Sequence, residues 1–430
     1  MRRLIGIVLA TFVATLLWAG TFLVGTLEGW WREPLAPSGD TSAFMAAATQ
    51  MIEAGKPGNF AMQLIERGQP VDGRFISIGE PVDRDTLFQV ASLGKWVTAL
   101  GVMTLVDAGK VDLDAPIETY LKRWKLPPSE FDHRQVTVRR VLSHTAGLTD
   151  RLGYAGFKPG QPIQSLPESL TRAADASPGR DGVVRVGAPP GESWNYSGGG
   201  FTMLQLLIED VTGESFDAYM RRAVLAPLGM FRSTFVLPHG GVDNLAEFYD
   251  VGGKPAVHFR FTATGAASLY TSVGDLTRLI QAHMPGPEGE PPGRDVVSPQ
   301  TLLEMRRPHA QQLGADIWGL GVMLYAPAKG GGHIIGHDGD NEPAINTAAR
   351  FDPASGDGIV VLQTGNSSLA TQMAGEWVFW QSGEVDNLVI LMEARQTLTT
   401  LAIGCLTIIL VGVAVGWWTR PRRTPGLAGP

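Results

Sequence analysis

Cysteine is almost missing from this chain of 430 residues, because Cys405 is the one cysteine and it lies in an apolar segment. No disulfide can form within the chain, so cysteine usage does not indicate the compartment in which the protein works. The eight histidines include no His-Glu-x-x-His or similar ligand spacing. The sequence therefore gives no reason to expect a metal or another cofactor.

Charge is scarce as well. Charged residues make up 18% of the chain and hydrophobic residues 44%, with a formal net charge of −7. A chain without a surplus of basic residues is not expected to bind nucleic acid. The length is sufficient for a large two-lobed domain or for two domains. Two long runs without charge account for much of the apolar balance.

The first uncharged run covers residues 4–27 and follows Arg2 and Arg3. A helix of roughly 20 apolar residues is long enough to cross a bilayer. A cleaved signal peptide is the rival interpretation, but its apolar core would be shorter and would end at a small-x-small site. The run shows no convincing Ala-x-Ala, so we expect an uncleaved anchor.

The second run, residues 398–418, ends in two tryptophans and precedes arginines at positions 420, 422 and 423. Tryptophan suits the water–lipid interface, and clustered arginine marks the cytoplasmic side. Both termini are therefore expected in the cytoplasm. Residues 28–397 are expected on the periplasmic or extracellular side of the cell membrane.

These runs divide the chain into six predicted segments. They are an anchor (1–27), a linker (28–40), a globular domain (41–381), a linker (382–397), a second transmembrane helix (398–418) and a cytoplasmic tail (419–430).

The globular part is organised around residues 88–95, which read Phe-Gln-Val-Ala-Ser-Leu-Gly-Lys. An apolar run to Gly109 follows them, which predicts a buried rather than an amphipathic helix. Ser92 and Lys95 are three residues apart, so they would lie on one face at the start of this helix. The N-terminal end of a helix also favours negative charge, which suits a hydroxyl nucleophile. Ser-x-x-Lys alone is weak evidence.

Other blocks accompany this pair in a fixed order, one before it and four after it. They are Asp-Thr-Leu-Phe at 85–88, Leu-Ser-His-Thr-Ala-Gly-Leu at 142–148, Tyr-Ser-Gly at 196–198, Leu-Gly-Met at 228–230 and Gly-His-Asp-Gly at 336–339. With them the chain resembles the serine β-lactamase and penicillin-recognising superfamily, in the branch that contains class C β-lactamases, DD-peptidases and related esterases. The resemblance implies an α+β fold, in which helices flank an antiparallel sheet beside a mostly helical lobe. A transmembrane helix is expected at each end.

The resemblance also implies roles. Ser92 would be the acylated nucleophile, with Lys95 beside it to accept or relay its proton and Tyr196 as partner base. A tyrosine beside a cation is expected to have a lowered pKa. Further residues would bind substrate: His337, Gly339, Asp340 and Gly198. The backbone N–H groups of Ser92 and Asp340 would form the oxyanion hole. The block around His144 is interpreted as a structural turn.

Two departures from the family pattern narrow the expected substrate. Gly198 stands where the family commonly has asparagine, and carboxylates follow His337 at Asp338, Asp340 and Glu342. Like charges repel, so we expect poor binding of penicillins and of D-Ala-D-Ala termini, which are anionic. A neutral ester, or a substrate with a cationic amine, would fit better.

Three functions stay open from the sequence. The first is a membrane-anchored serine esterase or amidase that acts on a small ester, amide or peptide outside the cytoplasm. The second is a DD-peptidase or β-lactamase of the cell wall. The third is a catalytically weakened scaffold subunit of a membrane complex. In each case the lipid bilayer is an expected partner, and the two spans also allow contact with a membrane protein.

Overall fold

The computed structural model describes residues 2–238 and 241–419, which form two compact units. The larger unit extends from Pro34 to Ser382. The smaller unit consists of the terminal segments up to residue 33 and from residue 383. The predicted tail, including its arginines, lies outside the described residues beyond Thr419.

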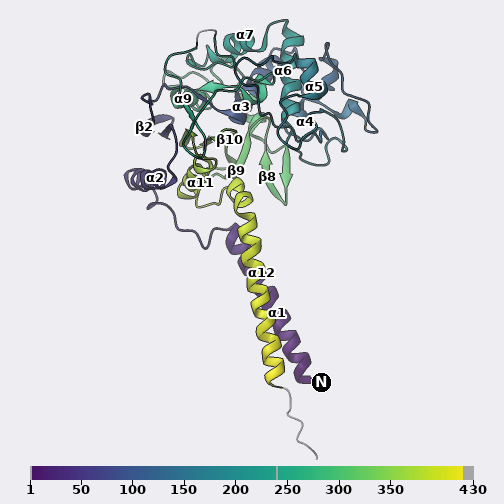
Figure 1. Cartoon of the computed structure of the whole chain (residues 1–430), viewed down its shortest axis with the longest axis vertical. Helices are drawn as coiled ribbons and strands as arrows, with labels where there is room; N and C mark the ends of the chain where they lie inside the picture. Colours follow the sequence, from purple (N-terminus) through teal and green to yellow (C-terminus); the bar gives the residue numbers. More distant parts are fainter. Residues whose placement is uncertain (1, 239–240, 420–430) are drawn as a thin grey trace, which may run out of the picture. The chain divides into compact units, whose positions relative to one another are not determined.

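An antiparallel sheet forms the centre of the larger unit (Figure 1), and its described strands follow the order β2-β1-β12-β11-β10-β9-β8-β7. The N-terminal hairpin thus joins strands from the C-terminal half, with β1 paired to β12. Strands β11 and β12 are buried along their whole length, as is typical of strands covered on both faces. The bounds are β1 (Phe60–Glu66), β2 (Gln69–Ile76), β7 (Ala310–Gln312), β8 (Ala315–Trp318), β9 (Met323–Pro327), β10 (His333–Asn341), β11 (Ile345–Phe351) and β12 (Gly358–Thr364).

Helices cover both faces of this sheet. Helices α2 (Thr41–Gly55) and α11 (Leu369–Ser382) share one hydrophobic cluster with the sheet, in which Phe44 and Trp377 are buried. Helix α9 (Val273–Gln281) packs on β1 and β12 and is capped by Ser272, whose side chain accepts from the backbone N–H of Asp275. These contacts bury the apolar stripes of the helices, which is how amphipathic helices in globular proteins are stabilised.

Helix α3 (Gly94–Asp107) lies between the sheet and the helical lobe, in contact with β10, α6 (Gly198–Thr212) and α8 (Thr264–Ala267). All of its residues from Gly94 to Met103 are buried, which confirms the prediction of a helix without an exposed face. Because α3 is covered on all sides, its first turn is held rigidly.

The remaining elements are short. They are β3 (Phe88–Gln89), η1 (Ala91–Leu93), η2 (Ile117–Thr119), η3 (His133–Gln135), α4 (Val138–Leu142), α5 (Leu166–Arg172), α7 (Phe216–Met220), η4 (Arg221–Leu225), β4 (Phe248–Tyr249), β5 (Pro255–Ala256), β6 (Tyr270–Thr271) and α10 (Pro299–Arg306).

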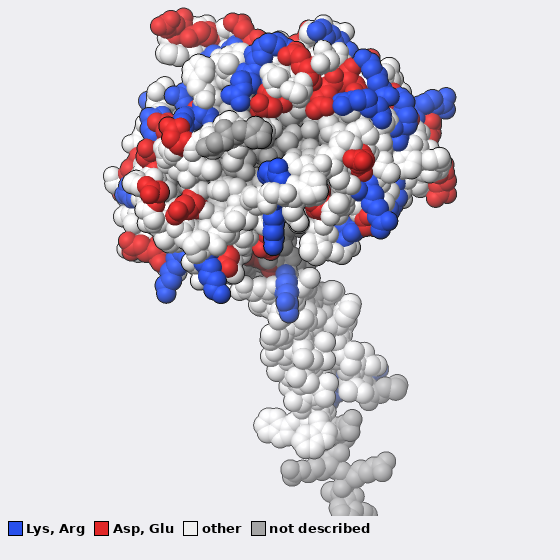
Figure 2. All heavy atoms as spheres, turned by 45° about the horizontal axis from the view of Figure 1, so that its top comes forward, with Lys and Arg blue, Asp and Glu red and all other residues white. Residues whose placement is uncertain are grey.

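The smaller unit is a pair of long helices, α1 (Arg2–Leu27) and α12 (Asn387–Trp418), which lie side by side (Figure 1). Both are long and apolar enough to cross a membrane, judged by length and composition. The indole N–H of Trp18 donates to the Leu401 carbonyl at 3.4 Å, beside Gly404. Figure 2 shows few charged side chains along these helices, whereas both signs are interspersed on the drawn face of the larger unit.

Helix α12 begins earlier than the sequence predicts. Its first residue is Asn387, so most of the predicted linker 382–397 is helical. Asp386 supplies the reason, because its carboxylate accepts a hydrogen bond from the backbone N–H of Leu388 at 2.7 Å and so caps the helix. Arg32 forms an ion pair with Glu393 within the same unit.

Candidate active site

Ser92 lies on the short 3-10 turn η1, immediately before α3 begins. The preceding residue, Ala91, has a positive φ of 47°, a conformation that non-glycine residues rarely adopt. Such strain persists where the surrounding structure fixes it, and it is common at functional sites. The Ser92 side chain is half-buried, so it remains open to an incoming molecule.

Lys95 lies beside this hydroxyl. Its Nζ is 2.9 Å from Ser92 Oγ, and it donates a second hydrogen bond to the Ala266 carbonyl at 2.7 Å. The residue is 2% exposed. Burial disfavours the charged amine and lowers the pKa of Lys95 to about 7. A substantial fraction of Lys95 is therefore a neutral amine near neutral pH, which can accept the serine proton.

Tyr196 completes this group, with its ring centroid 5.1 Å from Lys95 Nζ. The sequence predicts a lowered pKa for this phenol, and the structure indicates the opposite. Burial raises the pKa of Tyr196, although its hydrogen bond with Ser92 acts in the lowering direction. The physical reason is that desolvation outweighs the nearby cation, whose own charge is reduced. Tyr196 is thus a phenol near neutral pH.

Strand β10 brings the Gly-His-Asp-Gly block at 336–339 to the serine. It pairs with β9 only as far as Gly336, so beyond that residue its edge is free to face η1. A Cβ on Gly339 would lie 1.9 Å from the carbonyl oxygen of Val90. Only glycine permits this close approach of the strand to the turn that carries Ser92.

His337 is 1% exposed and lies near Lys95. Its Nδ1 is 2.6 Å from the Asp338 carbonyl, so Nδ1 carries the proton of the neutral imidazole and donates it. Burial and the neighbouring Lys95 lower the pKa of His337 to about 3. Its Nε2 has no hydrogen-bond partner among the described residues. His337 therefore offers a neutral acceptor rather than a positive charge.

The acidic residues of this block do not all face the serine. Successive side chains of a strand point to opposite faces, so Asp338 and Asp340 lie on the face away from His337 and Gly339. The Asp338 carboxylate forms an ion pair with buried Arg350. It also accepts hydrogen bonds from Tyr325 and Thr371, each at 2.7 Å. Asp338 is one of the three carboxylates expected to repel an anionic substrate. Because it is paired with Arg350 on the other face, it does not contribute to that repulsion.

Asp340 lies near the end of β10, close to the carboxylates of Asp338 and Glu342. Burial raises the pKa of this carboxyl, and the neighbouring Glu342 and Asp338 raise it further. The carboxyl is only partly buried, because the residue as a whole remains exposed to solvent. The structure thus places the Asp340 carboxylate beside the site rather than within it, while its backbone continues the strand edge that faces Ser92.

Gly198 is not brought to the substrate position. It is buried, its N–H donates to the Leu152 carbonyl at 2.9 Å, and a Cβ would lie 2.2 Å from that oxygen. The glycine is thus explained by the close packing of the Leu152 segment on the start of α6. Asp150 supports the same junction, because its carboxylate accepts a hydrogen bond from the N–H of Gly199 at 3.1 Å.

An aromatic group that the sequence does not single out surrounds these side chains. The ring of Trp318 lies 5.7 Å from that of Tyr196 and 5.4 Å from that of His337. Phe201 lies beneath Lys95, with its ring centroid 5.7 Å from Nζ. The Phe201 and Trp318 side chains are nearly fully buried, which keeps the surroundings of the amine apolar and its pKa low.

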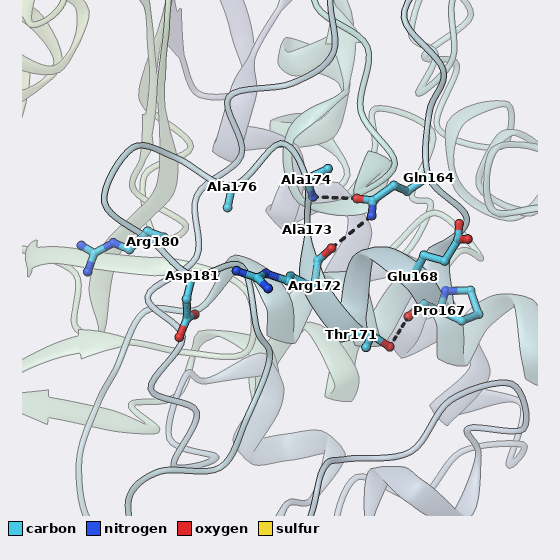
Figure 3. Close-up of a pocket in the computed structure, with 10 residues that line it drawn as sticks. All are labelled: Gln164, Pro167, Glu168, Thr171, Arg172, Ala173, Ala174, Ala176, Arg180 and Asp181. Atoms are coloured by element: carbon cyan, nitrogen blue, oxygen red, sulfur yellow. Dashed lines mark hydrogen bonds between the residues drawn. The ribbon is translucent and has the colours of Figure 1, made fainter.

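A separate hollow of about 750 Å³ lies beside α5, and Figure 3 shows its lining. Gln164 crosses it with hydrogen bonds to the backbone of Arg172 and Ala174, at 3.1 and 2.7 Å. The lining combines Arg172 and Arg180 with Glu168 and Asp181, and it contains no serine–lysine pair. The candidate chemistry is therefore at Ser92 and not in this hollow.

Comparisons with known proteins agree with this geometry. The model of the Beta-lactamase family matches residues 46–377. The chain belongs to this family. Esterase EstB of Burkholderia gladioli is 28% identical over 297 residues, which cover 59% of this chain and 71% of the esterase. Penicillin-binding protein 4 of Amycolatopsis lactamdurans is 28% identical over 306 residues, covering 68% and 75%.

A solved structure supports the fold. The octameric penicillin-binding protein homologue from Pyrococcus abyssi has a TM-score of 0.63 and 24% identity, covering 78% of this chain and 76% of that one. At this identity the likeness concerns the fold alone. The predictions of an α+β fold of the β-lactamase type and of a serine hydrolase related to β-lactamases are thus confirmed.

Proposed function

We propose that this protein is a membrane-anchored serine esterase that acts outside the cytoplasm through an acyl-enzyme on Ser92. The observation that carries the proposal is the 2.9 Å contact between Ser92 Oγ and the buried amine of Lys95. Catalysis by a hydroxyl needs a base within hydrogen-bond reach whose pKa is near the working pH. Burial gives Lys95 such a pKa, about 7.

In the proposed acylation, neutral Lys95 accepts the proton of Ser92 while Oγ attacks the carbonyl carbon of the ester. The backbone N–H groups of Ser92 and Asp340 stabilise the negative charge that develops on the carbonyl oxygen. Tyr196, which is a phenol near neutral pH, donates a proton to the departing alkoxide and recovers one from Lys95. Water then releases the acid by the reverse sequence of proton transfers.

A neutral ester is the favoured substrate class. An anionic substrate would need a cation at the Gly-His-Asp-Gly block, where this chain has His337 in a buried and neutral state. The amine of Lys95 is itself partly neutral, and Arg350 is engaged by Asp338 behind the strand. His337 Nε2 instead offers an acceptor for a hydroxyl or an amide N–H of the acyl group.

The proposed membrane anchoring rests on the two long helices α1 and α12. Their length and apolar composition suit two spans, and the arginines at both chain ends favour a cytoplasmic location of the termini. The catalytic unit would then lie at the outer face of the membrane, and the helices could contact a membrane-protein partner. Protease protection of intact spheroplasts, with the termini tagged, tests this orientation.

A cell-wall DD-peptidase or β-lactamase is the second candidate, because relatives in the family are named as penicillin-binding proteins. The deciding experiment compares acylation of detergent-solubilised protein by a neutral p-nitrophenyl ester and by a labelled penicillin. The proposal expects rapid ester turnover and slow penicillin labelling. Efficient penicillin turnover would reverse the assignment, and no reaction with either compound or with a fluorophosphonate would favour the scaffold role.

A further inference from the structure

The sequence suggests only a structural turn at His144, but the structure places this residue against the candidate catalytic tyrosine. His144 follows α4 and is 3% exposed. Its φ is 58°, in the left-handed region that few non-glycine residues adopt. Backbone strain of this kind is retained only where other contacts hold the residue in place.

Two hydrogen bonds connect His144 to the backbone on either side of Tyr196. The N–H of Asn195 donates to the His144 carbonyl at 2.8 Å. The N–H of Ser197 donates to the Nδ1 atom of the His144 ring at 3.2 Å. His144 therefore binds the backbone N–H groups of the two residues next to the tyrosine, that of Asn195 through its backbone and that of Ser197 through its side chain.

The same imidazole also packs against the tyrosine ring, with a centroid separation of 4.5 Å. Trp318 also contacts the imidazole, with ring centroids 4.7 Å apart in an edge-to-face arrangement. The indole N–H of Trp318 donates to the Leu142 carbonyl at 3.3 Å, which fixes the indole in turn. The Tyr196 ring thus packs against two rings that are themselves held in place. These contacts orient its hydroxyl toward Ser92 and Lys95.

The His144 imidazole stays in one neutral tautomer while it accepts the hydrogen bond from Ser197. Because Nδ1 accepts a hydrogen bond, the proton of the neutral ring lies on Nε2. Burial, together with Lys95 and His337, lowers the pKa of His144 well below its ordinary value. The ring therefore keeps its acceptor at Nδ1 over the pH range in which Lys95 titrates.

We propose that His144 is a positioning residue that holds Tyr196 against Ser92 and Lys95 by binding the backbone N–H groups of Asn195 and Ser197. The inference rests on the proposed function as far as Tyr196 acts as the proton donor. The hydrogen bond from Ser197 to the imidazole can nevertheless be tested apart from activity.

The test uses the full-length chain in detergent and two replacements of the imidazole. His144→Asn keeps an acceptor near the position of Nδ1, whereas His144→Leu keeps bulk and removes the acceptor. His283→Leu is the matched control, because His283 is also a buried histidine but packs on Trp96 and interacts with Arg306. The readouts are kcat and KM for a neutral p-nitrophenyl ester, thermal unfolding, and hydrogen exchange at the Ser197 amide.

We expect His144→Leu to lower kcat by about 10- to 100-fold with little change in KM, since small misplacements of catalytic groups have effects of this size. Exchange at the Ser197 amide should rise in the same variant. His144→Asn should recover most of kcat and of the exchange protection. His283→Leu should lower the unfolding temperature and leave kcat per folded molecule unchanged.

A wild-type kcat in His144→Leu would overturn the inference, and so would an equal loss of kcat in His144→Asn. Should His144→Leu fail to fold, His144→Gln replaces it. Its oxygen lies near the position of Nε2 and cannot accept from Ser197, so it should lose kcat where asparagine does not. If the wild-type chain cleaves no ester, the proposed function fails, and exchange at Ser197 still decides whether the imidazole holds this segment.

Discussion

The protonation of Lys95 gives the sharpest prediction about this site. An ordinary lysine has a pKa of 10.5, and burial lowers that of Lys95 to about 7. At pH 7 about half of Lys95 is then a neutral base, compared with about 1 in 3,000 for an unperturbed lysine. Burial of this one side chain thus raises the amount of available base by about three orders of magnitude.

The assay is the rate of Ser92 labelling by a neutral fluorophosphonate between pH 5 and pH 9. The rate should rise about tenfold per pH unit at low pH, bend near pH 7 and become constant above about pH 8. Lys95→Arg should abolish labelling at every pH, because a guanidinium stays protonated throughout. A rate that is flat from pH 5 to pH 9, or that still rises tenfold per unit at pH 9, would refute the assignment.

The pH dependence of the free energy of unfolding provides an independent measurement of the pKa of Lys95. Between pH 7 and pH 10.5 an unfolded chain keeps Lys95 protonated, whereas the folded chain does not. The unfolded state binds more protons, so the free energy of unfolding should rise with pH across this window, by up to about 1.4 kcal/mol per unit. Lys95→Met should remove that part of the slope in urea titrations at several pH values, and an unchanged slope would contradict the low pKa.

Three further substitutions probe neighbouring contacts. Tyr196→Phe should lower kcat by about 10²- to 10⁴-fold without lowering the unfolding temperature, whereas full activity would exclude the phenol as proton donor. Gly339→Ala would place a Cβ 1.9 Å from the Val90 carbonyl oxygen, so it should destabilise the fold by about 1–3 kcal/mol or more and stop labelling. Arg350→Leu leaves the Asp338 carboxylate without its cation and should cost about 3–5 kcal/mol in urea unfolding. Adding Asp338→Asn should recover part of that loss, and a purely additive double variant would speak against their pairing.

Much of the site could be predicted from the sequence because its signals are local. The spacing of Ser92 and Lys95 is a property of one helical turn, and the apolar run after them indicates a buried α3. The fold class followed from ordered blocks that the family comparison confirms. Helix ends with a side-chain cap, such as Ser272 before α9, could also be predicted closely.

The parts that could not be predicted depend on tertiary structure. A motif does not show which face of a strand is covered, so the sequence suggests that Asp338 faces the substrate, whereas in the structure it binds Arg350 on the other face. The raised pKa of Tyr196 results from burial by distant segments. Trp318 lies outside the motifs that the sequence analysis identifies. His144 lies within one of them, but its contact with Tyr196 depends on the tertiary structure.

Strand ends show the same limit on a smaller scale. Taken alone, the residues at 74–78 suggest a short strand, but β2 occupies Gln69–Ile76 because it pairs with β1 through a tight turn at Gly68. The residues at 319–325 likewise suggest a strand when read alone, but strand β9 begins only at Met323. Gly321 has a positive φ of 74° and forms the turn before it, which a pattern of apolar residues does not reveal.

The central claim is that Ser92 forms a covalent acyl-enzyme. The most direct measurement is intact-protein mass spectrometry of the detergent-solubilised chain, quenched in acid during turnover of a p-nitrophenyl ester. The account predicts a mass increase equal to one acyl group, located by peptide mapping on Ser92 and absent from Ser92→Ala. Turnover without any acyl adduct, or an adduct that persists in Ser92→Ala, would contradict it.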